Sequence, residues 1–105
     1  MTGIFYNEKW SYEQNYEKGP VALEKLKLPS FQKLNQSFTF LGYPVSLPFG
    51  IPAGPLLNSK FIKAAFDYGF AISTYKTVRA DSFPSHPFPN VLFVDAKDEL
   101  HPDRT

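Results

Sequence analysis

The alternation of apolar and polar residues between positions 38 and 47 predicts a short β-hairpin. Apolar side chains recur at every second position of two short runs, at Phe38, Phe40, Val45 and Leu47. Such alternation is typical of strands that bury one face. The segment Gly42-Tyr43-Pro44 lies between the two runs and is expected to form the turn, because glycine and proline favour turn geometry.

A different pattern, between positions 49 and 77, predicts two buried strands with a helix between them. Residues 49–53 and 70–76 are short apolar runs, too short for helices, and Gly54-Pro55 gives the first run a sharp end. The order strand, helix, strand within about 28 residues predicts a βαβ unit. In such a unit the two strands are parallel neighbours joined by a right-handed crossover.

The helix of this unit is expected over residues 59–68. Its apolar side chains recur at helical spacing, at Phe61, Ile62, Ala65 and Phe66. Asn58 or Ser59 is the candidate N-cap, because short polar side chains accept hydrogen bonds from the first free amides. Gly69 is the candidate stop, because glycine readily adopts the left-handed conformation that ends many helices.

The first 37 residues carry no clear period and are treated as an N-terminal extension. Trp10, Tyr12 and Tyr16 are spaced so that they either share a helical face or lie along an irregular arm. Gly19-Pro20 is a strong break, and the segment after it suggests one or two helical turns that end at Pro29. Two interpretations of the extension stay open. It is a surface on which a partner docks, or it packs on its own domain, and we favour the second.

Charge and composition narrow the classes of function. The chain has 11 basic and 10 acidic residues and a net charge of +1, so neither nucleic acid nor an anionic membrane is an expected partner. It has no cysteine, which excludes disulfides, thiolate zinc sites and cysteine nucleophiles, and no metal site is expected. The N-terminus lacks the pattern of a signal peptide and no stretch reaches the roughly 20 apolar residues of a membrane span. A cytoplasmic location is therefore expected.

The length of 105 residues allows one small domain or a part of a larger one. Hydrophobic residues make up 43% of the chain and aromatic residues 17%, so most of it is expected to pack into a core rather than stay disordered. A complete (β/α)8 barrel needs about 250 residues. If this chain belongs to such a barrel, it holds only its beginning.

Three motifs, in this order and spacing, resemble the first part of the dihydroorotate dehydrogenase barrel and the related barrel of dihydropyrimidine dehydrogenase. They are the strand-like Pro48-Phe49-Gly50-Ile51-Pro52-Ala53-Gly54, the strand end Thr74-Tyr75-Lys76-Thr77, and the loop Ser85-His86-Pro87-Phe88-Pro89-Asn90. The resemblance implies an α/β fold in which residues 38–105 begin a (β/α)8 TIM barrel that binds flavin mononucleotide (FMN). The hairpin before the first barrel strand would close the bottom of the barrel.

Three positions refine the resemblance. His86 stands where the family often has asparagine, and Asn90 stands where it often has arginine. Both lie in a loop on the substrate side, so these departures concern the substrate and not the fold. Lys76 stands where the membrane-associated class usually has glycine, which places the chain nearer the cytosolic class.

The candidate site residues end the two predicted strands, where barrel enzymes place their active sites. The resemblance implies that Ala53, Gly54, Lys76 and Thr77 contact FMN, and that Lys76 also touches the substrate and acts in catalysis. Small residues let a flat ring approach the backbone closely. A cation beside a flavin stabilises negative charge as the ring accepts a hydride. The alternatives are a glycine required only by a tight turn, and a lysine that reaches into solvent.

The reaction implied by the resemblance is the oxidation of dihydroorotate, or of a related dihydropyrimidine, by hydride transfer to FMN in pyrimidine metabolism. The general base of the family would lie beyond residue 105, so this chain alone is predicted to be inactive. The resemblance is compatible with a homodimer. Two other functions stay open: a small standalone interaction module with an aromatic, proline-rich surface, and a different flavin-dependent barrel oxidoreductase. Arg79, His86 and Tyr75 are more simply explained as surface or packing residues.

Overall fold

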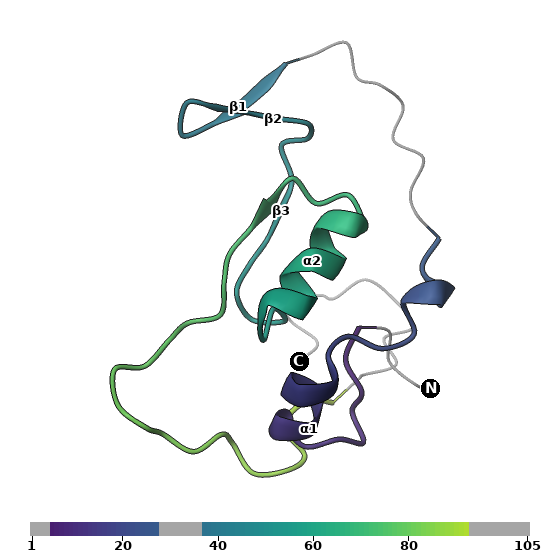
Figure 1. Cartoon of the computed structure of the whole chain (residues 1–105), viewed down its shortest axis with the longest axis vertical. Coiled ribbons are helices and arrows are strands. Elements are labelled where there is room, and N and C mark those ends of the chain that lie inside the picture. The colour runs from purple at the N-terminus through teal and green to yellow at the C-terminus, as the bar shows by residue number, and fades with distance from the viewer. Residues whose placement is uncertain (1–4, 28–36, 93–105) are drawn as a thin grey trace, which may run out of the picture.

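Two small sheets and two α-helices form the part of the chain that the computed structural model describes, residues 5–27 and 37–92 (Figure 1). In chain order the elements are α1 (Tyr12–Lys18), the 3₁₀ turn η1 (Leu23–Lys25), β1 (Phe38–Phe40), β2 (Tyr43–Val45), β3 (Gly50–Ile51), α2 (Ser59–Asp67) and β4 (Ile72–Ser73). The α/β class expected from the sequence is confirmed. Within the described ranges no helix has the length and apolarity to cross a bilayer. Pro29, the expected end of the turn after Gly19-Pro20, lies outside the described residues.

Strands β3 and β4 are parallel neighbours, as the apolar runs predicted, but each has only 2 residues and is shorter than the predicted strands 49–53 and 70–76. Gly50 pairs with Ile72 and Ile51 with Ser73, and α2 connects the two strands. The amide of Thr74 extends the ladder by donating to the carbonyl of Ile51 at 3.1 Å. A Cβ at Gly50 would lie 3.0 Å from the Cβ of Ile72. Glycine at this position therefore lets the two backbones approach closely.

Helix α2 is capped by Asn58 and not by Ser59. The Asn58 side chain accepts a hydrogen bond from the amide of Lys60 at 3.0 Å, and Gly69 follows the helix with a φ of +104°, as expected of a helix stop. The buried face holds Phe61, Ala64 and Ala65. The expected place of Phe66 on this face is wrong, because Ala64 lies nearer the centre of the buried face and Phe66, at its margin, is 50% exposed.

Strands β1 and β2 form the predicted antiparallel hairpin, but the expected turn at residues 42–44 is wrong. Phe38 pairs with Val45 and Phe40 with Tyr43, so the turn consists of Leu41 and Gly42. Both of these residues have positive φ, 49° and 81°, which is the geometry of a two-residue turn that matches the twist of the strands. Tyr43 and Pro44 lie in β2 instead, where an edge strand tolerates proline.

Residues 5–27 form a folded N-terminal segment that contains α1 and is called the arm below. Ser11 and Gln14 make a reciprocal capping box at its start, and the backbones of Phe5 and Val21 bond to each other in both directions. Of the two arrangements open for the aromatic residues, the helical one holds for Tyr12 and Tyr16, whose rings stack at 6.3 Å. Trp10 precedes the helix, with the ammonium of Lys18 4.2 Å from the centre of its ring.

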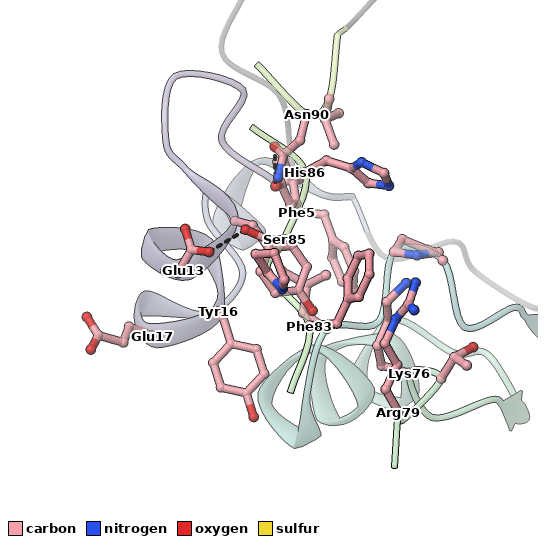
Figure 2. Close-up of a pocket in the computed structure, with 18 of the residues that line it drawn as sticks. Phe5, Glu13, Tyr16, Glu17, Lys76, Arg79, Phe83, Ser85, His86 and Asn90 are labelled. Carbon is pink, nitrogen blue, oxygen red and sulfur yellow. Dashed lines mark hydrogen bonds between the residues drawn. The ribbon is translucent and has the colours of Figure 1, made fainter. Parts of the chain in front are cut away.

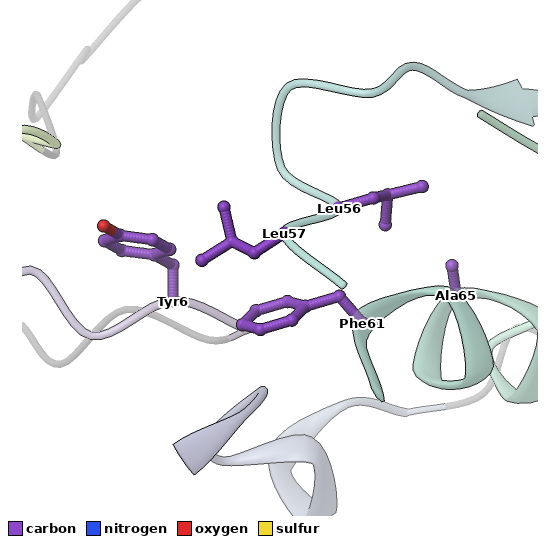
Figure 3. Packing of buried hydrophobic residues seen from close by; sticks show 5 residues of the cluster. All are labelled: Tyr6, Leu56, Leu57, Phe61 and Ala65. Atoms are coloured by element: carbon purple, nitrogen blue, oxygen red, sulfur yellow. The ribbon is translucent and has the colours of Figure 1, made fainter. Parts of the chain in front are cut away.

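The hydrophobic core joins this arm to α2 and to the segment before it. Its buried members are Tyr6, Leu56, Leu57, Phe61 and Ala65 (Figure 3). Phe5 meets Phe61 edge to face, with ring centres 5.3 Å apart. Phe5, Tyr6 and Tyr12 therefore pack on the same core as the βαβ unit, in agreement with the second interpretation of the extension.

Candidate functional site

A cavity of about 1200 Å³ lies beside the carboxyl ends of β3 and β4 (Figure 2). Three segments line it. They are the strand ends (Gly54, Pro55, Lys76 and Thr77, with the neighbouring Leu57), the arm (Phe5, Tyr6, Tyr12, Glu13, Tyr16 and Glu17) and the proline-rich loop after β4 (Arg79, Asp81, Phe83, Pro84, Ser85, His86, Asn90 and Val91). Because the two strands are parallel, their carboxyl ends share one edge of the sheet, and side chains that follow them meet there.

Three of the four residues predicted for the site line this cavity. Gly54 lies after β3, and Lys76 and Thr77 lie after β4. Ala53 is next to Gly54 but does not line the cavity, and its carbonyl accepts a hydrogen bond from the amide of Leu56 at 3.1 Å. The strand-end geometry thus brings Gly54, Lys76 and Thr77 together, while Ala53 belongs to the turn behind them.

Gly54 faces open space. A Cβ built at this position meets no heavy atom within 4 Å, and the φ of Gly54 lies outside the left-handed range. The turn geometry therefore does not require glycine here, which weakens the interpretation of Gly54 as a turn residue alone. The absence of a side chain leaves the backbone accessible to a flat ligand.

Two cations line the cavity, Lys76 after the end of β4 and Arg79 in the loop that follows. Lys76 is half-buried, and neither side chain forms a salt bridge with any described residue. The guanidinium carbon of Arg79 lies 3.8 Å from the centre of the Phe83 ring, a cation–π geometry that holds an arginine in one place. The expectation of a surface role for Arg79 is correct in that the residue is exposed, but the residue also lines the cavity.

The arm contributes phenols and carboxylates to the opposite wall. Burial, together with the nearby Tyr16 and Glu13, raises the pKa of Tyr12, so its hydroxyl stays protonated at neutral pH. The side-chain hydrogen bond from Ser85 is the main cause that lowers the pKa of Glu13, so its carboxylate stays charged. This wall of the cavity therefore carries the neutral hydroxyl of Tyr12, which can donate a hydrogen bond, and the negative charge of Glu13.

The two loop positions that depart from the resemblance have distinct places. His86 is exposed and lines the cavity. Asn90 accepts a hydrogen bond from the hydroxyl of Tyr6 at 3.0 Å, and the loop between them has no regular secondary structure. Tyr75, expected to pack between sheet and helices, is about half exposed.

Sequence reasoning did not foresee the arm as a wall of this cavity. The only signal was the four-residue spacing of Tyr12 and Tyr16, which indicated a helix but not its neighbour. The hydrogen bonds that fix the arm on α2 are accepted by backbone carbonyls. Because every residue has a carbonyl, no sequence pattern reveals which of them accept these bonds.

The parallel strands and the side chains at their carboxyl ends define an α/β protein with a candidate binding site at the strand ends. A curated relative, "Dihydroorotate dehydrogenase" from Dictyostelium discoideum, is 38% identical to this chain over 96 residues. The resemblance to the dihydroorotate dehydrogenase family is confirmed by this relative. The aligned part is 90% of this chain but 26% of the relative, so the chain spans about a quarter of the relative's length. No family model matches the chain, and no solved structure matches it significantly.

Proposed function

We propose that this chain is the N-terminal part of an FMN-dependent oxidoreductase that oxidises dihydroorotate, and that residues from 38 onward begin its (β/α)8 barrel. One observation carries the proposal. Gly54, Lys76 and Thr77 share a cavity at the carboxyl ends of two parallel strands, in a chain related to a protein named dihydroorotate dehydrogenase. Active sites of (β/α)8 enzymes lie at this end of the strands.

The residues at the strand ends suit a flavin. Gly54 leaves open space against the backbone, where a planar ring system can lie close. Thr77 lines the same cavity and has a hydroxyl and a backbone amide with which it can donate hydrogen bonds. FMN, when bound, supplies a hydride acceptor, which no amino-acid side chain offers.

Lys76 supplies the positive charge of the site. Its side chain is half-buried and free of salt bridges to the described residues, so its ammonium is available to an anionic partner. A preorganised cation is worth most where negative charge develops in a site that excludes water. The same ammonium can also bind the carboxylate of dihydroorotate and so orient it.

A second candidate function is a flavin-dependent barrel oxidoreductase that acts on another dihydropyrimidine. His86 favours it, because this residue lines the cavity at a position where the resemblance leads one to expect asparagine. A dihydropyrimidine without a carboxylate would not need an anion-binding group. Its oxidation would therefore depend less on Lys76 than the oxidation of dihydroorotate does.

The test is anaerobic reduction of the flavin in the purified complete enzyme. Dihydroorotate, dihydrouracil and dihydrothymine are each mixed with the enzyme, and the absorbance of the oxidised flavin is followed. The proposal expects FMN to copurify and dihydroorotate to bleach it fastest. Faster bleaching by an uncharged dihydropyrimidine would favour the second candidate. A complete enzyme that carries no flavin would overturn both.

A further inference from the structure

The arm is fixed at one end to the start of α2. The side-chain amide of Asn58 donates a hydrogen bond to the carbonyl of Tyr16 at 2.7 Å, and the ammonium of Lys60 donates one to the carbonyl of Glu17 at 2.5 Å. Gly19 closes the arm against Lys60, since a Cβ there would lie 3.0 Å from the lysine side chain. The part of the arm around Tyr16 and Glu17 is therefore fixed beside the strand ends.

The arm is also held together internally. Asn15 is completely buried, and its side chain bonds the backbones of Asn7, Trp10 and Ser11. A buried amide with all its partners fixes the surrounding backbone in a single arrangement. The segment from Tyr6 to α1 is therefore held as one unit, which the bonds to Asn58 and Lys60 fix to α2.

The far side of the arm bonds to the loop after β4. The hydroxyl of Ser85 donates to the carboxylate of Glu13, and the hydroxyl of Tyr6 donates to the side-chain oxygen of Asn90 at 3.0 Å. We call these two hydrogen bonds the clasp. Among the described residues, no backbone hydrogen bond connects residues 79–92 to other segments. The clasp is thus the polar attachment of this loop to the described chain.

The clasp sets where the loop stands relative to the strand ends. Arg79, Phe83 and His86 belong to the loop and line the same cavity as Lys76 (Figure 2). Gly54 lines this cavity too. Val91, at the end of the loop, also packs against the hydrophobic core. Loss of the clasp would therefore release the stretch from Arg79 to His86, while Val91 and the strand ends would stay in place. The loop wall would then be lost without any change at the strand ends.

We propose that the clasp holds this loop as a wall of the substrate site, with Glu13 and Tyr6 as positioning residues. This inference rests on the proposed function for its effect on substrate, but the clasp itself is a property of the chain. Both residues act through the loop and neither needs to touch the reacting atoms. Their loss should therefore weaken substrate binding and leave the chemical step nearly unchanged.

The experiment compares variants of the complete enzyme by hydrogen exchange of residues 79–92 and by steady-state kinetics with dihydroorotate. The variants are Glu13→Ala, Ser85→Ala, Tyr6→Phe and the double change of Glu13 and Ser85 to alanine. Glu13→Gln is the conservative variant, because its amide oxygen can still accept from Ser85. Glu24→Gln, an exposed carboxylate outside the cavity, is the matched control.

The expected result is faster exchange confined to residues 79–92 and a KM raised roughly three- to tenfold. That range corresponds to the loss of one hydrogen bond. The value of kcat should stay within about twofold, the double alanine variant should be no worse than either single one, and Glu13→Gln should recover part of the effect.

Unchanged exchange of residues 79–92 in all clasp variants would overturn the proposal. Faster exchange that extends to α2 would overturn it too, because the residues would then support folding and not the loop. Failure of the proposed function looks different. In that case the wild-type enzyme would not oxidise dihydroorotate, while hydrogen exchange would still show whether the clasp holds the loop.

Discussion

The side chain of Asn58 bonds to the backbone carbonyl of Tyr16 at 2.7 Å, across 42 positions of the sequence. The oxygen of the same side chain accepts from the amide of Lys60 and so caps α2. One amide therefore both starts the helix and fixes α1 beside it. Since parallel strands place this end of the helix at the carboxyl edge of the sheet, the arm necessarily lies next to the candidate site.

Replacement of Lys76 by alanine should lower the rate of flavin reduction by dihydroorotate on the order of 10²-fold in the complete enzyme, as the loss of a preorganised charge does elsewhere. The melting temperature should change little, because the side chain is half-buried and makes no salt bridge with a described residue. Stopped-flow absorbance measures the rate. Reduction at the wild-type rate would remove Lys76 from the mechanism.

Gly54 and Gly50 provide a matched pair of substitutions. Gly54→Leu should reduce the FMN content of the complete enzyme while leaving its stability nearly unchanged, because a side chain there enters open space. Gly50→Ala should destabilise the fold, since the new Cβ would lie 3.0 Å from Ile72 Cβ and 3.2 Å from the Ile72 carbonyl oxygen. Flavin absorbance and thermal melting measure the two effects. A Gly54→Leu enzyme with full flavin content would argue against a flavin at this strand end.

Asn15→Ala should destabilise the arm by about 1–3 kcal/mol, because buried backbone groups lose their hydrogen-bond partner. The side chain is completely buried and bonds three neighbouring backbone positions. Limited proteolysis should detect faster cleavage within residues 5–19. The exposed Lys9→Ala is the control, and equal cleavage of both variants would contradict the role assigned to Asn15.

Much of the βαβ unit could be predicted from the sequence, and much of the arm could not. Short apolar runs and a helical stripe have periods that the side chains themselves reveal, so the parallel pair and α2 followed from them. The turn at Leu41 was missed because leucine rarely adopts a positive φ. There the strand register decides the backbone conformation, and the local preference of the residue does not.

The candidate site, too, could be predicted from the sequence only in part. Gly54, Lys76 and Thr77 could be placed together because parallel strands share a carboxyl edge. Glu13 and Tyr16 could not be added to them, since their positions depend on long-range bonds from the arm to α2 and to the loop. No spacing in the sequence encodes a contact between residues more than 40 positions apart.

Acidification should weaken the clasp through Glu13. The hydrogen bond from Ser85, followed by smaller contributions from its own backbone amide and Ser11, lowers the pKa of Glu13 in the folded chain below its unfolded value. The stabilisation is therefore present above the unfolded pKa and is lost as pH falls through the folded pKa. Wild type and Glu13→Gln should differ in hydrogen exchange of residues 79–92 at neutral pH and converge in acid. A difference that stays constant with pH would contradict this titration.

The 105-residue chain alone should not bind FMN tightly or oxidise dihydroorotate. In (β/α)8 enzymes the phosphate of such ligands is usually held by loops after the seventh and eighth strands, and the proposed barrel has reached only its second strand at β4. Titration with FMN, followed by quenching of flavin fluorescence, measures the affinity. Saturable, tight binding of one FMN per chain would show that this chain is a small flavoprotein in its own right.

The hydrogen bond between Tyr6 and Asn90 spans 84 positions, so the two residues are synthesised at different times. A ribosome adds roughly 5–20 residues per second. Tyr6 therefore leaves the ribosome on the order of 4 to 17 seconds before its partner. During that interval the aromatic residues of the arm have no loop to bind, and they are exposed to chaperones or to neighbouring nascent chains. The contact between the arm and the loop can therefore form only after the arm has met α2.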